Sequence, residues 1–231
     1  MTDLLVPTNA KAVTRTSVAK KQTMAVTGLV LFGFVVAHMA GNLKFFTGES
    51  HFDEYAEFLR RIGDPILGHA WALWILRAGL LVSVVLHIWA AVSLTRQSRA
   101  ARPVPYAQPK TVQANYASRT MRWGGIIILL FVIYHLLHMT VGTVHPDFHE
   151  GRVYDNSVAA FQVWYVTLAY VVAVGAVSLH LYHGVWSMVQ TLGANNARID
   201  ARLRAVSKTV ALVIFVGFVS VPLAVLFGYG H

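Results

Sequence analysis

Residues 23–45 read TMAVTGLVLFGFVVAHMAGNLKF, and the only side chains in this stretch that ionise near neutral pH are His38 and Lys44. About 20 apolar residues are enough to cross the roughly 30 Å hydrocarbon layer of a bilayer. The stretch therefore predicts a membrane-spanning helix. Four further stretches have the same apolar character and sufficient length: 69–95, 121–143, 160–192 and 205–229. The sequence thus predicts an all-α integral membrane protein, a bundle of five helices.

The composition supports a single membrane domain. The chain has 231 residues, of which 56% are hydrophobic and 13% charged, a balance typical of integral membrane proteins. We expect residues 1–22 to form an N-terminal arm and residues 23–231 the helical domain. The arm runs directly into a full-length span, so no cleavable signal peptide is expected. Because the chain contains no cysteine, it offers no thioether attachment for a haem and no thiolate ligand for an iron–sulfur cluster.

The net charge of +9 is distributed asymmetrically about the predicted spans. Residues 1–22, 96–122 and 198–208 together hold fourteen of the nineteen Lys and Arg residues, whereas the opposite connections hold eight of the ten acidic residues. The positive-inside rule then places the N-terminus in the cytoplasm and the C-terminus outside. This distribution fits a multi-pass protein of the inner (cytoplasmic) membrane in contact with lipid, and we expect no nucleic-acid partner. Arg77 is the exception, about two turns inside the second span.

Two connections have recognisable patterns. Residues 99–109 contain three prolines, which predict an extended cytoplasmic segment. Residues 51–62 place Phe52, Tyr55 and Leu59 at helical spacing, which predicts a short amphipathic helix at the outer membrane surface. The alternative for this segment is a solvated loop with fortuitous periodicity.

Four histidines lie inside four different spans: His38, His87, His135 and His180. Ionisable groups in hydrocarbon are costly and usually functional, and neutral imidazole is a common metal ligand. At 1.5 Å per residue, His38 and His135 are level with each other in the outer half of the bilayer. His87 and His180 are level nearer the cytoplasm, roughly 15 Å away along the membrane normal. Two histidine pairs at two depths predict two haems within a helical bundle.

The spacing leaves two questions open. His138 and His183 follow His135 and His180 by three residues and share much of the same helical face, so spacing does not choose between the members of each pair. Intramembrane histidines also form hydrogen bonds between helices. A haem-free structural anchor, in which these histidines only pack, is therefore an alternative from another functional class.

Several segments resemble the cytochrome b membrane anchor of succinate dehydrogenases and fumarate reductases, in its five-helix dihaem form. They are AHMAGN at 37–42, LHIW at 86–89, RWGGIIILLFVIYH at 122–135 and HLYHGVWS at 180–187. The resemblance covers nearly the whole chain beyond residue 20. It implies that His38 and His135 bind the outer haem iron and that His87 and His180 bind the inner one. One departure is Ser178, which stands where some dihaem fumarate reductases carry an acidic residue.

The surroundings of these histidines supply candidate cofactor contacts. Haem propionates prefer cations and hydroxyls, which Arg122 and Ser187 offer near the inner haem and Arg77 and His138 near the outer one. Glycines near the ligands could make room for a flat macrocycle: Gly41, Gly124, Gly125, Gly142 and Gly184. Candidate quinone-binding residues are Asp53, Glu54, Glu57 and His69 on the outer side and Trp123, Trp186 and Ser187 on the cytoplasmic side.

The resemblance implies a subunit of succinate:quinone oxidoreductase, the complex II of the tricarboxylic acid cycle. Its cofactors would be two haems b and a quinone, generally menaquinone for dihaem members. Its partners would be a flavoprotein subunit and an iron–sulfur subunit, with a possible higher oligomer of the complex. The chain lacks a flavin-binding fold, so we expect no succinate chemistry from this subunit alone. The alternative within electron transfer is the cytochrome b subunit of a formate dehydrogenase or hydrogenase.

Overall fold

Five long helices make up most of the computed structural model, which describes residues 16–101 and 116–230. They are α2 (Ser17–Leu43), α4 (Trp71–Ala100), α5 (Tyr116–Leu136), α7 (Trp164–Thr191) and α8 (Asp200–Leu226). Each is long and apolar enough to cross a membrane, and the described residues contain no strand. The predicted all-α fold with five spans is therefore confirmed, and the chain is a multi-pass membrane protein.

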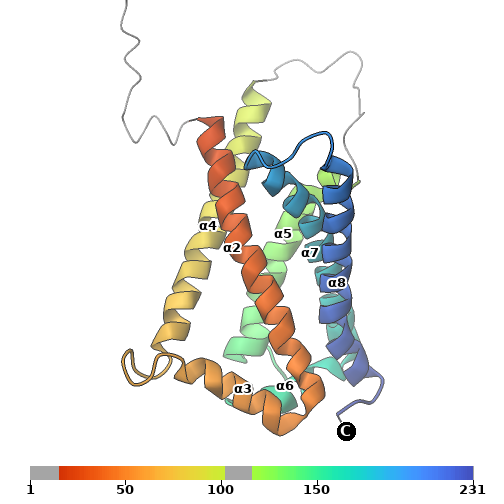
Figure 1. Ribbon diagram of the computed structural model, residues 1–231. Helices are drawn as coiled ribbons and strands as arrows, with labels where there is room; N and C mark the ends of the chain where they lie inside the picture. Colours follow the sequence, from red (N-terminus) through yellow and green to blue (C-terminus); the bar gives the residue numbers. More distant parts are fainter. Residues whose placement is uncertain (1–15, 102–115, 231) are drawn as a thin grey trace, which may run out of the picture.

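The helices pack unevenly around the bundle (Figure 1). The helix α2 packs along α4, and α5 packs along α7; α8 lies against both α7 and α2. By contrast, α2 makes no extensive contact with α5, nor α4 with α7. In the most apolar part of α4 and of α5 only 6% of residues are buried within the protein, against 33% in α7 and in α8. In α2 the share is 11%, but α2 packs against α4, α7 and α8. We therefore call α2, α7 and α8 the packed centre and describe α4 and α5 as outlying.

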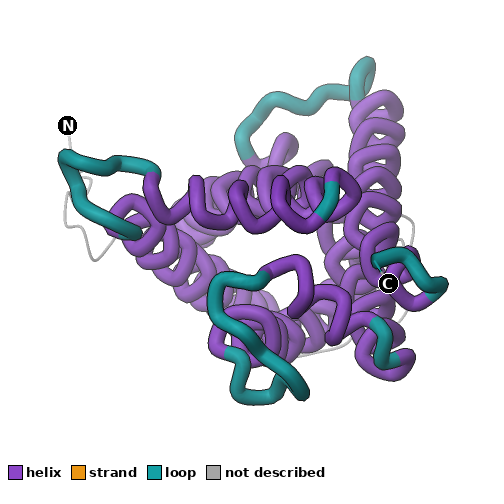
Figure 2. The backbone as a smooth tube through the Cα atoms, turned by 90° about the horizontal axis from the view of Figure 1, so that it is seen from below, coloured by secondary structure: helices purple, strands orange, loops and turns teal. Residues whose placement is uncertain are grey.

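One end of the bundle, which we call the cap end, is covered by two short helices, α3 (Glu49–Arg61) and α6 (Val153–Phe161). Seen from below in Figure 2, α3 lies across this end. Phe52 of α3 is buried beside Phe45, whose ring stacks on Tyr154 of α6 at 4.6 Å, and Asp53 Oδ1 accepts a hydrogen bond from the Tyr154 backbone N–H. The helix predicted over 51–62 is thus confirmed. The opposite end carries most of the described Lys and Arg residues, and we call it the basic end.

The span predicted over 160–192 is confirmed as the single helix α7, but it begins at Trp164, four residues later than predicted. The chain breaks between α6 and α7, where Val163 adopts an extended conformation. The Thr167 hydroxyl donates to the carbonyl of Phe161 at 2.8 Å and so satisfies one of the carbonyls left free where α6 ends. The break lets α6 lie at the cap end while α7 crosses the bundle.

Other boundaries differ by smaller amounts. The helix α2 begins at Ser17, where Thr16 caps it by accepting the Ala19 N–H; the predicted arm before residue 16 lies outside the described residues. The helix α4 continues to Ala100, so the first two residues of the predicted extended segment 99–109 are helical, and residues 102–109 are not described. The helix α5 finishes in a π turn, η2 (Leu137–Val141), which Gly142 closes with a φ of +80° that favours glycine.

Candidate functional site

The structure brings the four intramembrane histidines together as two facing pairs. The ring centroids of His38 and His135 are 5.8 Å apart and their planes cross at 76°. The centroids of His87 and His180 are 6.3 Å apart with an angle of 58°. The first pair joins α2 to α5 and the second joins α4 to α7, which are the helix combinations that do not otherwise pack. All four side chains are half-buried, and each pair bridges two helices through its rings.

The two pairs lie at two levels, and two independent contacts give their separation. A Cβ at Gly28 would stand 3.4 Å from His87 Cε1, and His38 follows Gly28 by ten residues on α2. Tyr170 contacts His135, and His180 follows Tyr170 by ten residues on α7. At 1.5 Å per residue both routes give about 15 Å. We call His38 and His135 the cap-side pair, and His87 and His180 the basic-side pair.

The spacing within each pair fits a haem iron between the two rings. Two coordinate bonds of about 2 Å each, placed in line, together with the two ring radii put imidazole centroids roughly 6 Å apart. No group of three or more His, Asp or Glu side chains suitable for a metal ion occurs within residues 16–101 and 116–230. Each pair thus offers two protein ligands, the number that a haem needs when its own ring supplies the other four. Two axial imidazoles leave no position for oxygen, a ligand set suited to electron transfer.

The neighbouring histidines His138 and His183 face elsewhere. His138 is fully buried in the π turn, where its ring stacks on Tyr134 at 5.1 Å and on His145 at 4.8 Å. The ring of His183 lies 5.9 Å from Trp186. The structure therefore places His135 and His180, and not the histidines three residues later, opposite His38 and His87.

Two hydroxyl groups that the sequence patterns did not point to contact the pairs. Thr27 Oγ1 lies 3.1 Å from His87 Nδ1, and Tyr170 Oη lies 3.3 Å from His135 Nδ1 and 3.0 Å from His138 Nδ1. Both hydroxyls occupy the level of the histidine that they contact, so the depth comparison that paired the histidines could have found them. Each leaves Nε2 of its histidine free to bind a metal.

The predicted glycines separate into two groups. A Cβ at Gly124, Gly125 or Gly184 would meet no atom within 4 Å, so these positions leave room beside α5 and α7. A Cβ at Gly41 would instead stand 3.0 Å from the ring of Tyr55, and one at Gly142 would collide with the ring of Phe148. Gly41 and Gly142 therefore serve protein packing, whereas the other three are available to a flat ligand.

The predicted propionate contacts lie at suitable levels. Arg77 precedes His87 by ten residues on α4, which places it level with the cap-side pair. Its guanidinium lies 4.8 Å over the Trp74 ring, and within the described residues no carboxylate pairs with it. Nε2 of His138 is buried with no protein partner. Arg122 and Ser187 lie beyond the basic-side pair, towards the basic end.

The predicted quinone residues on the cap side mostly have protein partners. Asp53 binds the backbone of α6, Glu57 pairs with Arg61 at 3.1 Å and Arg60 at 3.7 Å, and Glu54 lies 3.9 Å from His51. His69 lies 3.9 Å from Asp64. These carboxylates are on the surface of the cap, and Asp53 has a structural role that the sequence did not show.

The two predicted tryptophans at the basic end differ in environment. The Trp186 indole donates to Asp200 at 2.9 Å, and the Arg204 guanidinium covers its ring at 4.1 Å. This network fixes the turn between α7 and α8. Trp123 is 72% exposed and free to contact lipid, a partner protein or a quinone.

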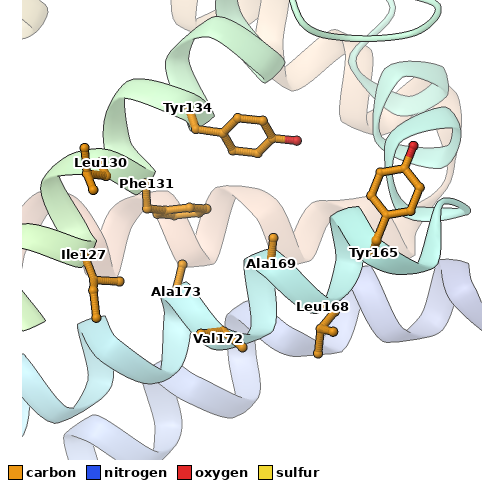
Figure 3. A pocket seen from close by; sticks show the side chains of 9 residues that line it. All are labelled: Ile127, Leu130, Phe131, Tyr134, Tyr165, Leu168, Ala169, Val172 and Ala173. Carbon is orange, nitrogen blue, oxygen red and sulfur yellow. The ribbon is translucent and has the colours of Figure 1, made fainter.

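An apolar groove of about 470 Å³ runs between α5 and α7, lined by Ile127, Leu130, Phe131, Tyr134, Tyr165, Leu168, Ala169, Val172 and Ala173. Figure 3 shows the two tyrosines at one end of the groove and the Phe131 ring with aliphatic side chains along the rest. Tyr134 also stacks on His138, so the groove adjoins the buried histidine cluster beside the cap-side pair. No protein-family model, curated protein or solved structure matches this chain.

Proposed function

We propose that this chain is the membrane-anchoring, dihaem cytochrome b subunit of a succinate:quinone oxidoreductase, which carries electrons between an iron–sulfur partner and a quinone in the bilayer. The observation that carries the proposal is the arrangement of four histidines as two facing pairs, at two levels, across helices that do not otherwise pack. Each haem, when bound, supplies a one-electron centre with both axial positions filled.

Different residues of the chain would bind different parts of the two haems. His38 and His135 would bind the iron at the cap-side level, and His87 and His180 would bind it at the basic-side level. The open positions at Gly124, Gly125 and Gly184 would accept the flat ring. Arg77 and the orphaned Nε2 of His138 would meet propionates of the cap-side haem. Arg122 and Ser187 would do so at the basic end, together with His183, whose buried Nδ1 also has no partner.

One feature favours succinate chemistry in a partner subunit over other electron donors, namely the resemblance of the four ligand-bearing segments to the succinate dehydrogenase and fumarate reductase anchor. The described part of the chain forms no flavin-binding sheet, so the flavin of such a complex would belong to a partner. We assign the basic end to the cytoplasm of an inner membrane, because ten of the fifteen Lys and Arg within residues 16–101 and 116–230 belong to that end.

The direct test is the haem content of the purified protein. A pyridine haemochrome assay should give about two haems b per chain, and the oxidised spectrum should be low-spin, because both axial positions are filled. A protein that holds one haem or none, in membranes with normal haem supply, would contradict the proposal and leave the haem-free anchor.

The acidic cap residues give a second, narrower prediction. Glu54 and Glu57 lie on α3 beside the cap-side level, and as general acid–base groups they should assist quinone protonation by about 10²- to 10⁴-fold. We expect the pair Glu54→Gln and Glu57→Gln to slow quinone reduction in the assembled complex while both haems are retained.

Asp53→Ala is the matched control for this experiment, because Asp53 caps α6 by accepting the Tyr154 N–H and Ala has no acceptor to replace it. Its loss should lower thermal stability more than the loss of Glu54 and Glu57 does. Quinone reduction at the wild-type rate in the double variant would move the proposed quinone site to the basic end, near Trp123, Trp186 and Ser187.

A further inference from the structure

Hydroxyl groups from the packed centre of the bundle contact the ligand histidines of the outlying helices. Thr27 on α2 contacts His87 on α4, and Tyr170 on α7 contacts His135 on α5. Each of the helices α2 and α7 thus provides a haem ligand at one level and a hydroxyl at the other level. The helix α2 carries His38 of the cap-side pair and Thr27 at the basic-side level, whereas α7 carries His180 of the basic-side pair and Tyr170 at the cap-side level.

The hydrogen bonds around Thr27 determine which ring nitrogen of His87 carries the proton. The Thr27 hydroxyl lies 2.7 Å from the carbonyl of Thr23 and donates its only proton there. Its oxygen can then only accept from His87, so Nδ1 of His87 is protonated and the lone pair of Nε2 is free. This is the tautomer that binds a metal through Nε2.

Tyr170 offers the equivalent hydroxyl contact at the other level, between His135 and His138. Its side chain is 6% exposed, and its hydroxyl has one proton to share between two histidines. If His135 donates from Nδ1 to the phenol oxygen, the phenol can donate to the nearer Nδ1 of His138 at 3.0 Å. Nε2 of His135 is then free, as in His87. In this assignment the Nδ1–H of His135 donates to the phenol oxygen, and the phenol O–H donates to Nδ1 of His138. Both Nδ1 atoms and the hydroxyl then have a hydrogen-bond partner.

The burial of the helices explains why these two histidines need such partners. The helices α4 and α5 are the least buried of the five long helices, so a hydroxyl from a neighbouring helix supplies each of their imidazoles with a fixed polar contact. The other two ligands stand on α2 and α7, in the packed centre; His38 stacks on Phe34 at 5.2 Å, and Nδ1 of His180 is buried without a partner. Each pair thus contains one histidine with a hydroxyl partner and one without.

We propose that Thr27 and Tyr170 are positioning residues, one for each haem, which hold His87 and His135 in the ligating tautomer and set the electron donation of each imidazole to its iron. The inference rests on the proposed function. An acceptor on Nδ1–H makes the imidazole a stronger donor, which stabilises the oxidised metal, and outer partners of this kind typically alter metal affinity by about 10- to 100-fold.

The test measures the midpoint potential of each haem separately in the purified complex. Thr27→Val, which keeps the side-chain volume, should shift the potential of the His87–His180 haem upward and leave the other unchanged. Tyr170→Phe should do the same to the His38–His135 haem alone. Each variant should also release its own haem more readily, by about 10- to 100-fold. Haem identity is assigned from the haem that His87→Ala and His135→Ala remove.

Matched controls separate positioning from packing. Thr27→Ser retains the hydroxyl and should keep the wild-type potential. Thr23→Val removes a neighbouring hydroxyl of α2 that bonds only the Ala19 carbonyl, and Tyr165→Phe removes an exposed phenol of α7; neither should shift a potential. The inference is overturned if neither Thr27→Val nor Tyr170→Phe changes a midpoint potential. It is also overturned if either variant shifts the potentials of both haems equally. In both cases a count of two haems per chain would still uphold the proposed function. Thr27→Val tests the inference at the basic-side haem even if Tyr170→Phe does not fold. A wild-type protein that contains no haem overturns both proposals.

Discussion

Replacing either member of a histidine pair by Ala is expected to remove one haem and leave the other. His38→Ala and His135→Ala should lose the cap-side haem, and His87→Ala and His180→Ala the basic-side haem, so that the haem content falls from about two to about one per chain. The physical reason is that each pair lies about 15 Å from the other, so neither site shares a ligand with its neighbour. Pyridine haemochrome assay and redox titration of the remaining haem measure the result.

The chain provides its own controls for this experiment. His138→Ala and His183→Ala change histidines on the same two helices, three residues from the proposed ligands, that face away from His38 and His87. Both variants keep the two axial ligands of each haem and should therefore retain two haems, and only the proposed propionate contact of His138 or His183 is lost. His138→Ala should still lower thermal stability, because the side chain is fully buried and its loss leaves a cavity. A haem lost from His138→Ala but kept in His135→Ala would mean that the ligand on α5 is misassigned by three residues.

The sequence predicted the fold well because hydrocarbon imposes two simple constraints. A span must be long and apolar, and its rise of 1.5 Å per residue converts position into depth. The second constraint identified which histidines are level, and the structure places them face to face as predicted. Spacing alone left His135 and His138 equivalent, because the choice depends on helix rotation, which neighbouring helices determine. The resemblance made that choice, and the facing ring of His38 agrees with it.

The features that the sequence did not predict depend on tertiary contacts. The break at Val163 lies within an apolar run that satisfies every length criterion, and only the Thr167 hydroxyl bonded to the Phe161 carbonyl marks it. Gly41 and Gly142 looked like space for a ligand, but the rings of Tyr55 and Phe148 use that space. Asp53 looked like a proton donor for quinone, yet it caps α6 across a separation of about a hundred residues.

Succinate is expected to reduce both haems in native membranes that contain the chain together with its proposed partners. The chain has no cysteine to hold an iron–sulfur cluster and no flavin-binding sheet among its described residues, so in the proposed function electrons would enter from a docked protein. The basic end would provide the docking surface: the described residues there include Lys20, Arg96, Arg99 and Arg202. Complementary charge on a partner would favour association at this face. The measurement is the reduced α-band absorbance after addition of succinate, and mild detergent purification should recover a flavoprotein and an iron–sulfur subunit.

Two comparisons make this expectation specific to succinate. Formate and hydrogen are the donors for the alternative cytochrome b subunits, and neither should reduce the haems in the same membranes. His180→Ala should remove the basic-side haem, so that its absorbance is missing after succinate is added, and the amount of anchored flavoprotein should stay the same if the bundle still folds. Recovery of molybdenum- or nickel-containing subunits, or haems that stay oxidised with succinate while formate or hydrogen reduces them, would assign the chain to another dehydrogenase. The two histidine pairs would keep their proposed role in that case, since their geometry does not depend on which donor supplies the electrons.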